Sequence, residues 1–184
     1  MAETSTMIPL GTTAPSFTLP DTLSGETKSL EELKSDIATV VMFICNHCPY
    51  VIHVQPQLVQ LAQDYQTKGI SFVAINSNDS ENYPDDAPDK MKEVGKRLGY
   101  PFPYLFDEDQ EVARAYSAAC TPDTFIFDGD MKLVYRGQLD GARPGNQVPV
   151  TAVDARNALD DLLAGRTINP NQKPSMGCSI KWKL

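Results

Sequence analysis

The sequence predicts an α/β fold in which helices flank a central mixed β-sheet. Residues 40–44 and 70–75 are two short apolar runs, rich in β-branched and large side chains, as expected for buried strands. A helical segment of about five turns separates them, and the strands of such a βαβ unit are parallel with a right-handed connection. Residues 124–127 and 132–136 flank a turn at residues 128–130, which predicts an antiparallel hairpin. A sheet that contains both units is mixed.

Length and charge limit the class of protein. The chain has 184 residues, enough for one domain with a substantial core. Its net charge of -8 argues against nucleic acid or an anionic membrane as a partner. No apolar stretch approaches the length of a membrane span, and residues 1–15 lack the pattern of a signal peptide. We therefore expect a cytoplasmic protein, in which cysteines more often serve catalysis, redox sensing or metal binding than structural disulfides.

Residues typical of helix ends define the segments around the βαβ unit. Residues 1–28 predict an irregular lead-in with one short edge strand at residues 16–19. Ser29 can cap a short helix at residues 30–34, because Glu32 is placed to complete a capping box. The long helix of the βαβ unit has one apolar face and ends near a glycine that can serve as its C-cap: Val54, Leu58, Leu61, Tyr65 and Gly69.

An inserted segment separates the βαβ unit from the hairpin. Asp86 is positioned to cap a helix that ends at Gly99, so the acidic cluster at residues 79–89 is interpreted as a solvated loop with a helix cap. The other elements expected in this half of the chain are a short strand, a short helix and a closing helix, at residues 102–106, 109–117 and 153–165.

The end of the chain has a pattern of its own. Every second residue from Cys178 to Leu184 is apolar, which predicts an extended segment with one buried side. We expect this segment to pack against the rest of the molecule, with Trp182 as its largest buried side chain. The sequence is therefore divided into a domain at residues 1–166 and a C-terminal tail at residues 167–184 that packs on it.

The chemistry is expected where the first buried strand meets the long helix, at the Cys-x-x-Cys motif of Cys45 and Cys48. Backbone N–H groups and the dipole at a helix N-terminus stabilise a thiolate, so the pKa of Cys45 should lie below that of a free thiol. Cys48 would resolve a mixed disulfide at Cys45, and a protonated His47 between them would further favour the thiolate. The alternative is a metal site completed by His47, His53 or Cys178. Because a second spaced ligand pair is missing, we expect no metal.

The order of these elements and the position of the motif resemble the thioredoxin-like superfamily. A second match is Thr121-Pro122, directly before the strand at residues 124–127. The resemblance implies that Pro122 is cis and faces the dithiol, and that Thr121 binds the substrate backbone. The insertion at about residues 77–107 is typical of the branch that includes the peroxiredoxins and the TlpA/ResA-like thiol-disulfide oxidoreductases. The tail at residues 174–182 resembles that of bacterial proteins labelled only "thioredoxin family protein".

The chain also departs from these patterns. Thr39 stands where thioredoxin has a buried carboxylate, and Ile44 stands where a tryptophan usually precedes the first cysteine. A peroxiredoxin carries a threonine three residues before its peroxidatic cysteine, whereas Met42 occupies that position before Cys45. It also carries an arginine near the position of Pro122, and none stands there. A peroxide bound at Cys45 would thus lack the hydroxyl and the cation that polarise it.

The motif and the resemblance together predict a thiol-disulfide oxidoreductase without a dissociable cofactor. Cys45 would attack a protein or small-molecule disulfide, Cys48 would resolve the intermediate, and an external thiol reductant would restore the dithiol. The alternatives are a thiol peroxidase that uses Cys45 and, from another class, a redox-responsive interaction module. Cys120 and Cys178 form a candidate second redox pair, or at least lie within reach of each other and of the first pair. Cys120 directly precedes Thr121, and the tail is long enough to cross the domain.

Overall fold

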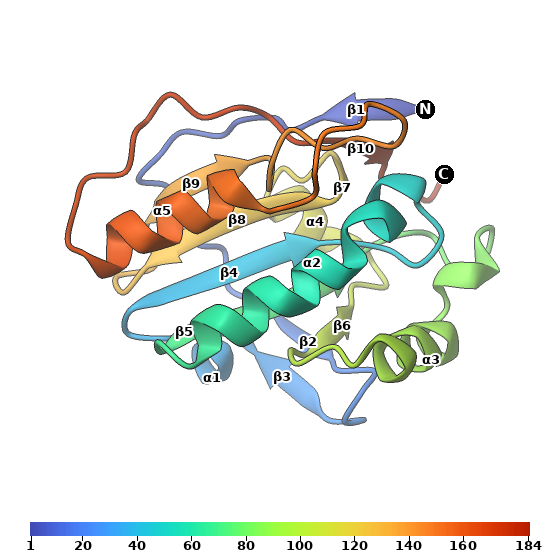
Figure 1. Ribbon diagram of the computed structural model, residues 1–184. Coiled ribbons are helices and arrows are strands. Elements are labelled where there is room, and N and C mark those ends of the chain that lie inside the picture. Colours follow the sequence, from blue (N-terminus) through green and yellow to red (C-terminus); the bar gives the residue numbers. More distant parts are fainter.

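A five-stranded mixed sheet lies at the centre of the structure, a computed structural model that describes all residues from 1 to 184. In spatial order its strands are β6 (Tyr104–Phe106), β5 (Ile70–Asn76), β4 (Ala38–Phe43), β8 (Asp123–Asp128) and β9 (Leu133–Gly137). β4 is parallel to β5 and antiparallel to β8, and β6 and β9 form the edges (Figure 1). The mixed sheet expected from the βαβ unit and the hairpin is confirmed.

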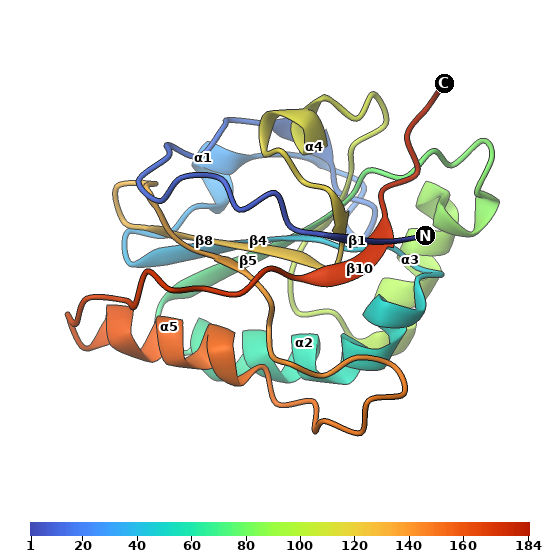
Figure 2. The ribbon, with the colours of Figure 1, turned by 90° about the horizontal axis from the view of Figure 1, so that it is seen from above.

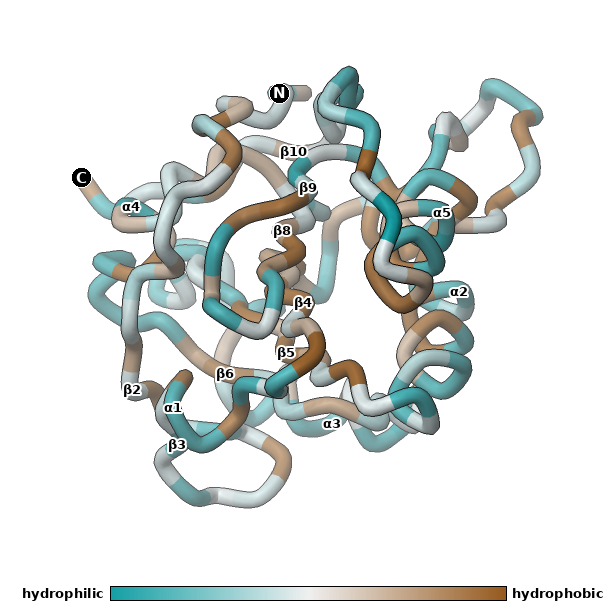
Figure 3. Tube along the Cα trace, turned by 90° about the vertical axis from the view of Figure 1, so that its left-hand side faces the viewer, coloured by the Kyte–Doolittle hydropathy of each residue, from teal (hydrophilic) through white to brown (hydrophobic).

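Helices cover both faces of this sheet (Figure 2). One face packs against α2 (Pro49–Gln66), α3 (Pro88–Leu98) and α5 (Val153–Leu163), and the other against α1 (Leu30–Leu33) and α4 (Glu111–Ala115). Successive side chains of a strand point to opposite faces, so β4 contributes to a separate apolar layer on each side. Figure 3 shows this as hydrophobic colour along β4, β5 and β8 at the centre. The structure contains no helix with the length and apolar character needed to cross a membrane.

The start of α2 decides which cysteine lies at the helix terminus. The helix begins at Pro49, which occupies its first turn as expected, and Cys48 is the N-cap residue. Cys45 therefore lies three residues before the helix cap. At its other end α2 stops at Gln66, and Gly69 takes up the left-handed conformation with φ +85°.

Two predicted helix caps have different outcomes. The capping box is present, because the Glu32 N–H donates to Ser29 Oγ at 3.2 Å and the Ser29 N–H donates to Glu32 Oε1 at 3.3 Å. The cap predicted for Asp86 is wrong. Ala87 is the N-cap residue of α3, and Asp86 ends a 3₁₀ helix, η1 (Pro84–Asp86), with no exposed surface. Its carboxylate points inward because buried polar groups bind it there.

Two smaller sheets lie beside the central one. They are β2 (Thr18–Pro20) with β3 (Thr27–Ser29), and β1 (Ala2–Thr4), β10 (Met176–Ser179) and β7 (Cys120–Thr121) in that order, and all pairs are antiparallel. The lead-in, expected to hold one short edge strand, thus supplies β1, β2 and most of β3. Figure 2 shows β1 and β10 side by side, so the two ends of the chain meet in one sheet.

The tail is extended, as its alternation predicted, but its buried side chain is not the expected one. Ile180 is 3% exposed and belongs to an apolar cluster of the central sheet. Trp182 is 37% exposed, and the Arg114 guanidinium lies over its ring at 4.6 Å from the centroid. The prediction that Trp182 contributes the most burial is wrong, because its ring lies at the surface against Arg114 while Ile180 enters the apolar cluster.

Candidate active site

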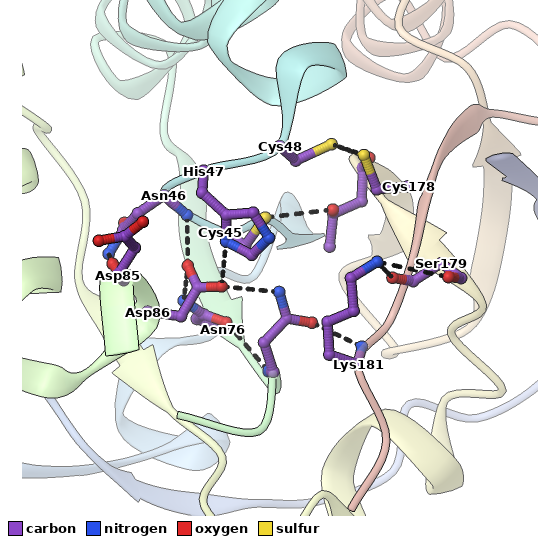
Figure 4. A network of polar contacts seen from close by, with 12 residues as sticks. Cys45, Asn46, His47, Cys48, Asn76, Asp85, Asp86, Cys178, Ser179 and Lys181 are labelled. Atoms are coloured by element: carbon purple, nitrogen blue, oxygen red, sulfur yellow. Dashed lines mark hydrogen bonds and ion pairs between the residues drawn. The ribbon is translucent and has the colours of Figure 1, made fainter. Parts of the chain in front are cut away.

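The two cysteines of the motif lie where β4, α2 and β7 converge (Figure 4). Neither cysteine has exposed surface. Cys45 Sγ is 3.4 Å from Thr121 Oγ1, and Cys48 Sγ is 3.3 Å from the carbonyl oxygen of Thr121. The Thr121–Pro122 peptide bond is cis, as the resemblance implied. The structure therefore brings four of the predicted site residues together at the carboxyl end of β4.

Of the two thiols, Cys48 is the one that ionises readily. A hydrogen bond with the Cys45 thiol is the main cause that lowers the pKa of Cys48 to about 5. Burial opposes this change, whereas Cys178 and the backbone N–H of Val51, in the first turn of α2, add to it. The same contact raises the pKa of Cys45, which keeps the shared proton, and burial and the carboxylate of Asp86 raise it further. The predicted low pKa for Cys45 is wrong, because the hydrogen bond between the two thiols raises the pKa of Cys45 and lowers that of Cys48, and the start of α2 adds to the effect at Cys48.

A buried carboxylate organises the loop between the two cysteines. Asp86 Oδ1 accepts hydrogen bonds from the Asn46 N–H at 2.7 Å and from Asn76 Nδ2 at 3.2 Å. Asp86 Oδ2 accepts one from Asn78 Nδ2 at 2.9 Å and lies 2.6 Å from His47 Nδ1 (Figure 4). Burial alone would raise the pKa of Asp86, but the contacts with His47, Asn78 and Asn46 outweigh it and hold that pKa below its ordinary value. The site therefore contains a fixed negative charge.

His47 forms an ion pair with the Asp86 carboxylate. The contact with Asp86 raises the pKa of His47, against the effect of partial burial, so the imidazole carries a proton over a wider pH range. The ring stacks on Tyr83 with a centroid distance of 5.8 Å. The tuning role expected for His47 requires a protonated imidazole near the thiols. The negative charge of Cys48 also contributes to the raised pKa of His47. His53, further along α2, takes no part in these contacts.

Asp86, Asn76 and Asn78 are site residues that the sequence reasoning missed. A signal was present, since β4 and β5 are parallel and their carboxyl ends meet at the same edge of the sheet. The polar residues that follow β5 therefore lie beside the cysteines that follow β4. Asp86 returns to this edge after a further turn, and only the fold reveals that.

Three groups of metal-ligand type lie together, because the ligating atoms of Cys45, His47 and Asp86 are all within 4.8 Å of one another. Three such protein ligands are the smallest set that zinc sites use. Both oxygens of Asp86 are already held by the amides of Asn46, Asn76 and Asn78. The carboxylate of this cluster is thus engaged in a hydrogen-bond network within the protein.

The structure separates the candidate second redox pair. Cys178 on β10 stands opposite Thr121, and its Sγ lies 2.7 Å from Cys48 Sγ (Figure 4). Cys120 is one residue before Thr121, so strand alternation turns its side chain to the other face, where its Sγ lies 3.7 Å from the Pro122 carbonyl oxygen. Burial raises the pKa of Cys120. The thiol in contact with Cys178 is therefore Cys48 and not Cys120, so the expectation that Cys178 lies within reach of the first pair is confirmed.

Comparison with protein families and named proteins gives a consistent result. The model of the AhpC/TSA family matches residues 10–136. The thiol-disulfide oxidoreductase ResA of Geobacillus kaustophilus (strain HTA426) is 27% identical over 136 residues, which cover 73% of this chain and 73% of ResA. "Putative peroxiredoxin MT2597" of Mycobacterium tuberculosis (strain CDC 1551 / Oshkosh) is 27% identical over 146 residues, which cover 73% of this chain and 87% of that protein.

Two solved structures are similar along almost the whole chain. An uncharacterized conserved protein from Geobacillus kaustophilus has a TM-score of 0.98 at 63% identity, covering 100% of this chain and 97% of that one. The hypothetical protein SMc02350 from Sinorhizobium meliloti 1021 has a TM-score of 0.96 at 46% identity and covers 98% of both chains. A thiol:disulfide interchange protein from Chlorobium tepidum TLS, at 22% identity and a TM-score of 0.64, covers 85% of this chain and 99% of its own. The fold is therefore thioredoxin-like.

Proposed function

Because the chain belongs to the AhpC/TSA family of thioredoxin-like redox proteins, we propose that it is a thiol-disulfide oxidoreductase whose redox couple is the dithiol of Cys45 and Cys48. The observation that carries this proposal is the enclosed dithiol, whose two sulfurs both lie against Thr121, the residue before the cis Pro122, and whose Cys48 has its pKa lowered to about 5 by the Cys45 thiol. A thiolate is the nucleophile of disulfide exchange, and a neighbouring thiol resolves the mixed disulfide that it forms.

The proposed reaction moves two electrons from the dithiol to a substrate disulfide. The Cys48 thiolate attacks one substrate sulfur, and the other leaves as a thiolate that takes a proton from water. Cys45 then loses its proton and attacks Cys48 Sγ, so that the second substrate sulfur leaves as a thiol and a Cys45–Cys48 disulfide remains. An external thiol reductant returns the two electrons. The roles of the two cysteines are thus the reverse of those predicted from the sequence, because the pKa order is reversed.

The buried carboxylate supports the second step. Cys45 must be deprotonated before it attacks, and Asp86 lies close enough to its sulfur to receive the proton directly or through one water molecule. Asp86 is already ionised, because its hydrogen bonds hold its pKa below the ordinary value. It would thus supply the function of the carboxylate that thioredoxin carries at the position of Thr39.

A thiol peroxidase is the second candidate function. The similarity to MT2597 and the low pKa of Cys48 favour it, since a peroxidatic cysteine reacts as a thiolate. The hydrogen-bond partners of the two sulfurs outside the pair are Thr121 and Cys178, and neither carries the positive charge that would polarise a peroxide; the nearby cation, His47, is paired with the Asp86 carboxylate. This absence favours disulfide exchange over peroxide reduction.

The test measures insulin reduction and hydrogen peroxide consumption by the purified chain, with dithiothreitol as the electron source. We expect insulin reduction above the rate of dithiothreitol alone, its loss in Cys45→Ser and Cys48→Ser, and its retention in the matched control Cys120→Ala. The double variant Cys45→Ser, Cys178→Ser should also trap substrate on Cys48, because both thiols near Cys48 that could resolve the mixed disulfide are gone. Peroxide consumption without insulin reduction would make the peroxidase the function. The absence of both activities would leave the redox-responsive interaction module.

A further inference from the structure

The C-terminal tail packs directly against the dithiol of Cys45 and Cys48. β10 lies between β1 and β7, and its register sets Cys178 opposite Thr121, the residue that contacts both cysteine sulfurs. Gly177 allows this approach, because a Cβ atom there would lie 1.9 Å from the Thr121 carbonyl oxygen. A side chain at that position would push β10 away from the site. The close placement of Cys178 is therefore a property of the strand pairing.

The sulfur atoms are arranged for exchange. Cys178 Sγ and Cys48 Sγ are 2.7 Å apart, so a disulfide of about 2.05 Å requires them to approach by only about 0.6 Å. Cys45 and Cys48 have no exposed surface, whereas Cys178 is partly exposed. Cys178 is thus the one thiol of the three that a molecule in solution can reach while the tail is in place.

We propose that Cys178 is a third redox-active cysteine, which exchanges with an oxidised Cys45–Cys48 pair to form a Cys48–Cys178 disulfide that an external thiol reductant can reach. This inference rests on the proposed function, because it requires that the dithiol is oxidised by substrate. It assigns the tail a step in the reaction, namely the return of electrons to the enclosed dithiol.

The first step is an isomerisation without net oxidation. Cys178 loses its proton and attacks Cys48 Sγ; the bond between Cys45 and Cys48 breaks, and Cys45 leaves and takes up a proton. An external thiol then attacks Cys178 Sγ, and Cys48 leaves as a thiolate. The low pKa of Cys48 favours this direction of opening, since a thiol of lower pKa leaves faster. A second external thiol attacks the mixed disulfide at Cys178, restores its thiol and is released in an external disulfide, so two electrons enter the protein.

Contacts on the far side of Cys178 keep the reduced tail in register. The Lys181 N–H donates to Asn78 Oδ1 at 2.9 Å, and the Lys181 carbonyl oxygen accepts from the Asp79 N–H at 2.9 Å and from Gln110 Nε2 at 2.8 Å. Ile180 is buried between these contacts and Cys178. All of these contacts are non-covalent. In the proposed cycle, β10 therefore leaves the site when no disulfide holds it. The open form would admit substrate to Cys48, and the disulfide-bonded form would close it.

The first measurement is the mapping of disulfides by mass spectrometry in the full chain, after oxidation with diamide and alkylation of the remaining thiols. We expect a peptide linked through Cys48 and Cys178 in the Cys45→Ser variant, and one linked through Cys45 and Cys48 in the Cys178→Ser variant. Cys120→Ala is the matched control and should give the same linked peptides as the unaltered chain. Cys178→Ala is prepared beside Cys178→Ser, so that an effect of the new hydroxyl on strand packing is recognised.

The second measurement is the rate at which glutathione reduces the oxidised protein. We expect the Cys178→Ser variant to be reduced about tenfold more slowly than the unaltered chain and Cys120→Ala, because its enclosed disulfide reacts only after local opening. Equal rates would overturn the proposal.

The two proposals fail in different ways. If Cys48 and Cys178 both stay free in oxidised Cys45→Ser while Cys178→Ser still forms the Cys45–Cys48 disulfide, the role of Cys178 is wrong and the proposed function stands. If Cys178→Ser and Cys178→Ala remain folded by circular dichroism but form no Cys45–Cys48 disulfide, the proposed function is wrong as well. A linked peptide between Cys120 and Cys178 in the unaltered chain would also overturn the proposal, in favour of the pair predicted from the sequence.

Discussion

Replacing Cys45 with alanine should raise the pKa of Cys48. The hydrogen bond with the Cys45 thiol is the largest cause of the low pKa of Cys48, and alanine removes that donor without adding charge. A hydrogen bond to a charged group contributes about 1.5–3 kcal/mol, and about 1.4 kcal/mol changes a pKa by one, so we expect the pKa of Cys48 to rise from about 5 to about 6–7. Cys178 and the first turn of α2 still stabilise the thiolate, which is why the pKa should stay below that of a free thiol.

The assay is the rate of iodoacetamide alkylation at Cys48, followed by mass spectrometry of its peptide at a series of pH values. Only the thiolate reacts, so the midpoint of the rate profile reports the pKa even though burial lowers the absolute rate. Cys120→Ala serves as the control and should leave the midpoint unchanged. A midpoint for Cys48 that is the same with and without the Cys45 thiol would refute the reasoning. So would an unaltered chain in which Cys45 is alkylated at lower pH than Cys48.

The same variant should change how stability depends on pH. The pKa of Cys48 is lower in the folded chain than in the unfolded chain, so the folded state favours the thiolate. This contribution is full above the unfolded pKa of about 8.5 and is lost as the pH falls through the folded pKa of about 5. Urea titrations should show a free energy of unfolding that decreases over this range, and the decrease should be smaller in Cys45→Ala.

Three further predictions concern the surroundings of the dithiol. His47→Ala should lower the reduction potential measured in thiol redox buffers, because a positive charge that stabilises the reduced thiolate is lost. For this two-electron couple, about 30 mV corresponds to 1.4 kcal/mol. An unchanged potential would contradict the electrostatic account. Asp86→Asn should lower the pKa of His47 in an NMR titration. The contact between the two side chains stabilises the folded chain below about pH 6.5, and this stabilisation is lost as the pH rises through the folded pKa of His47. The free energy of unfolding of the variant should therefore show no decrease over that pH range. Gly177→Ala should destabilise the fold by about 1–3 kcal/mol in urea titrations, because its Cβ atom would meet the Thr121 carbonyl oxygen. The control Gly141→Ala, whose Cβ atom would meet only the Val148 side chain at an ordinary contact distance of 3.9 Å, should change stability by less than about 0.5 kcal/mol.

Features that depend on neighbouring residues were predictable from the sequence. The apolar run of β4, the periodic face of α2 and the apolar run of β5 gave the correct order and direction of the central elements. Gly99, predicted to end α3, has φ +67°, which few other residues adopt at low cost. Each of these signals lies within the element that it defines, so the rest of the fold has little influence on it.

The lower pKa was predicted for the wrong thiol because it depends on the hydrogen bond between Cys45 and Cys48 and on where a helix begins, to within a few residues. Sequence patterns place helix ends less reliably than helices themselves. The prediction put Cys45 at the terminus of α2, but the first N–H groups of the helix lie beside Cys48. The hydrogen bond between the thiols and this difference of three residues together lower the pKa of Cys48 rather than that of Cys45.

Contacts between distant segments could not be predicted from the sequence for a different reason. The alternation in the tail correctly predicted an extended chain, but the pairing of β10 with β7 decided that Cys178 meets Cys48 and that Ile180, rather than Trp182, is buried. Such a pairing depends on the position of a sheet edge that other parts of the chain build. The sequence contains no local signal for it.

The missing carboxylate at Thr39 is explained by the same long-range contacts. Thr39 Oγ1 accepts a hydrogen bond from the Ser35 N–H at 2.9 Å, so this position supports the turn before β4. The buried negative charge is supplied instead by Asp86, and Asn78 connects it to the tail, with its Nδ2 on the Asp86 carboxylate and its Oδ1 on the Lys181 N–H. A proton taken up by Asp86 would weaken its bond with Asn78, and movement of the tail would strain the same amide. In the proposed reaction, the carboxylate that receives the proton of Cys45 is thus linked through Asn78 to the tail that carries Cys178, which a carboxylate on the central strand would not be.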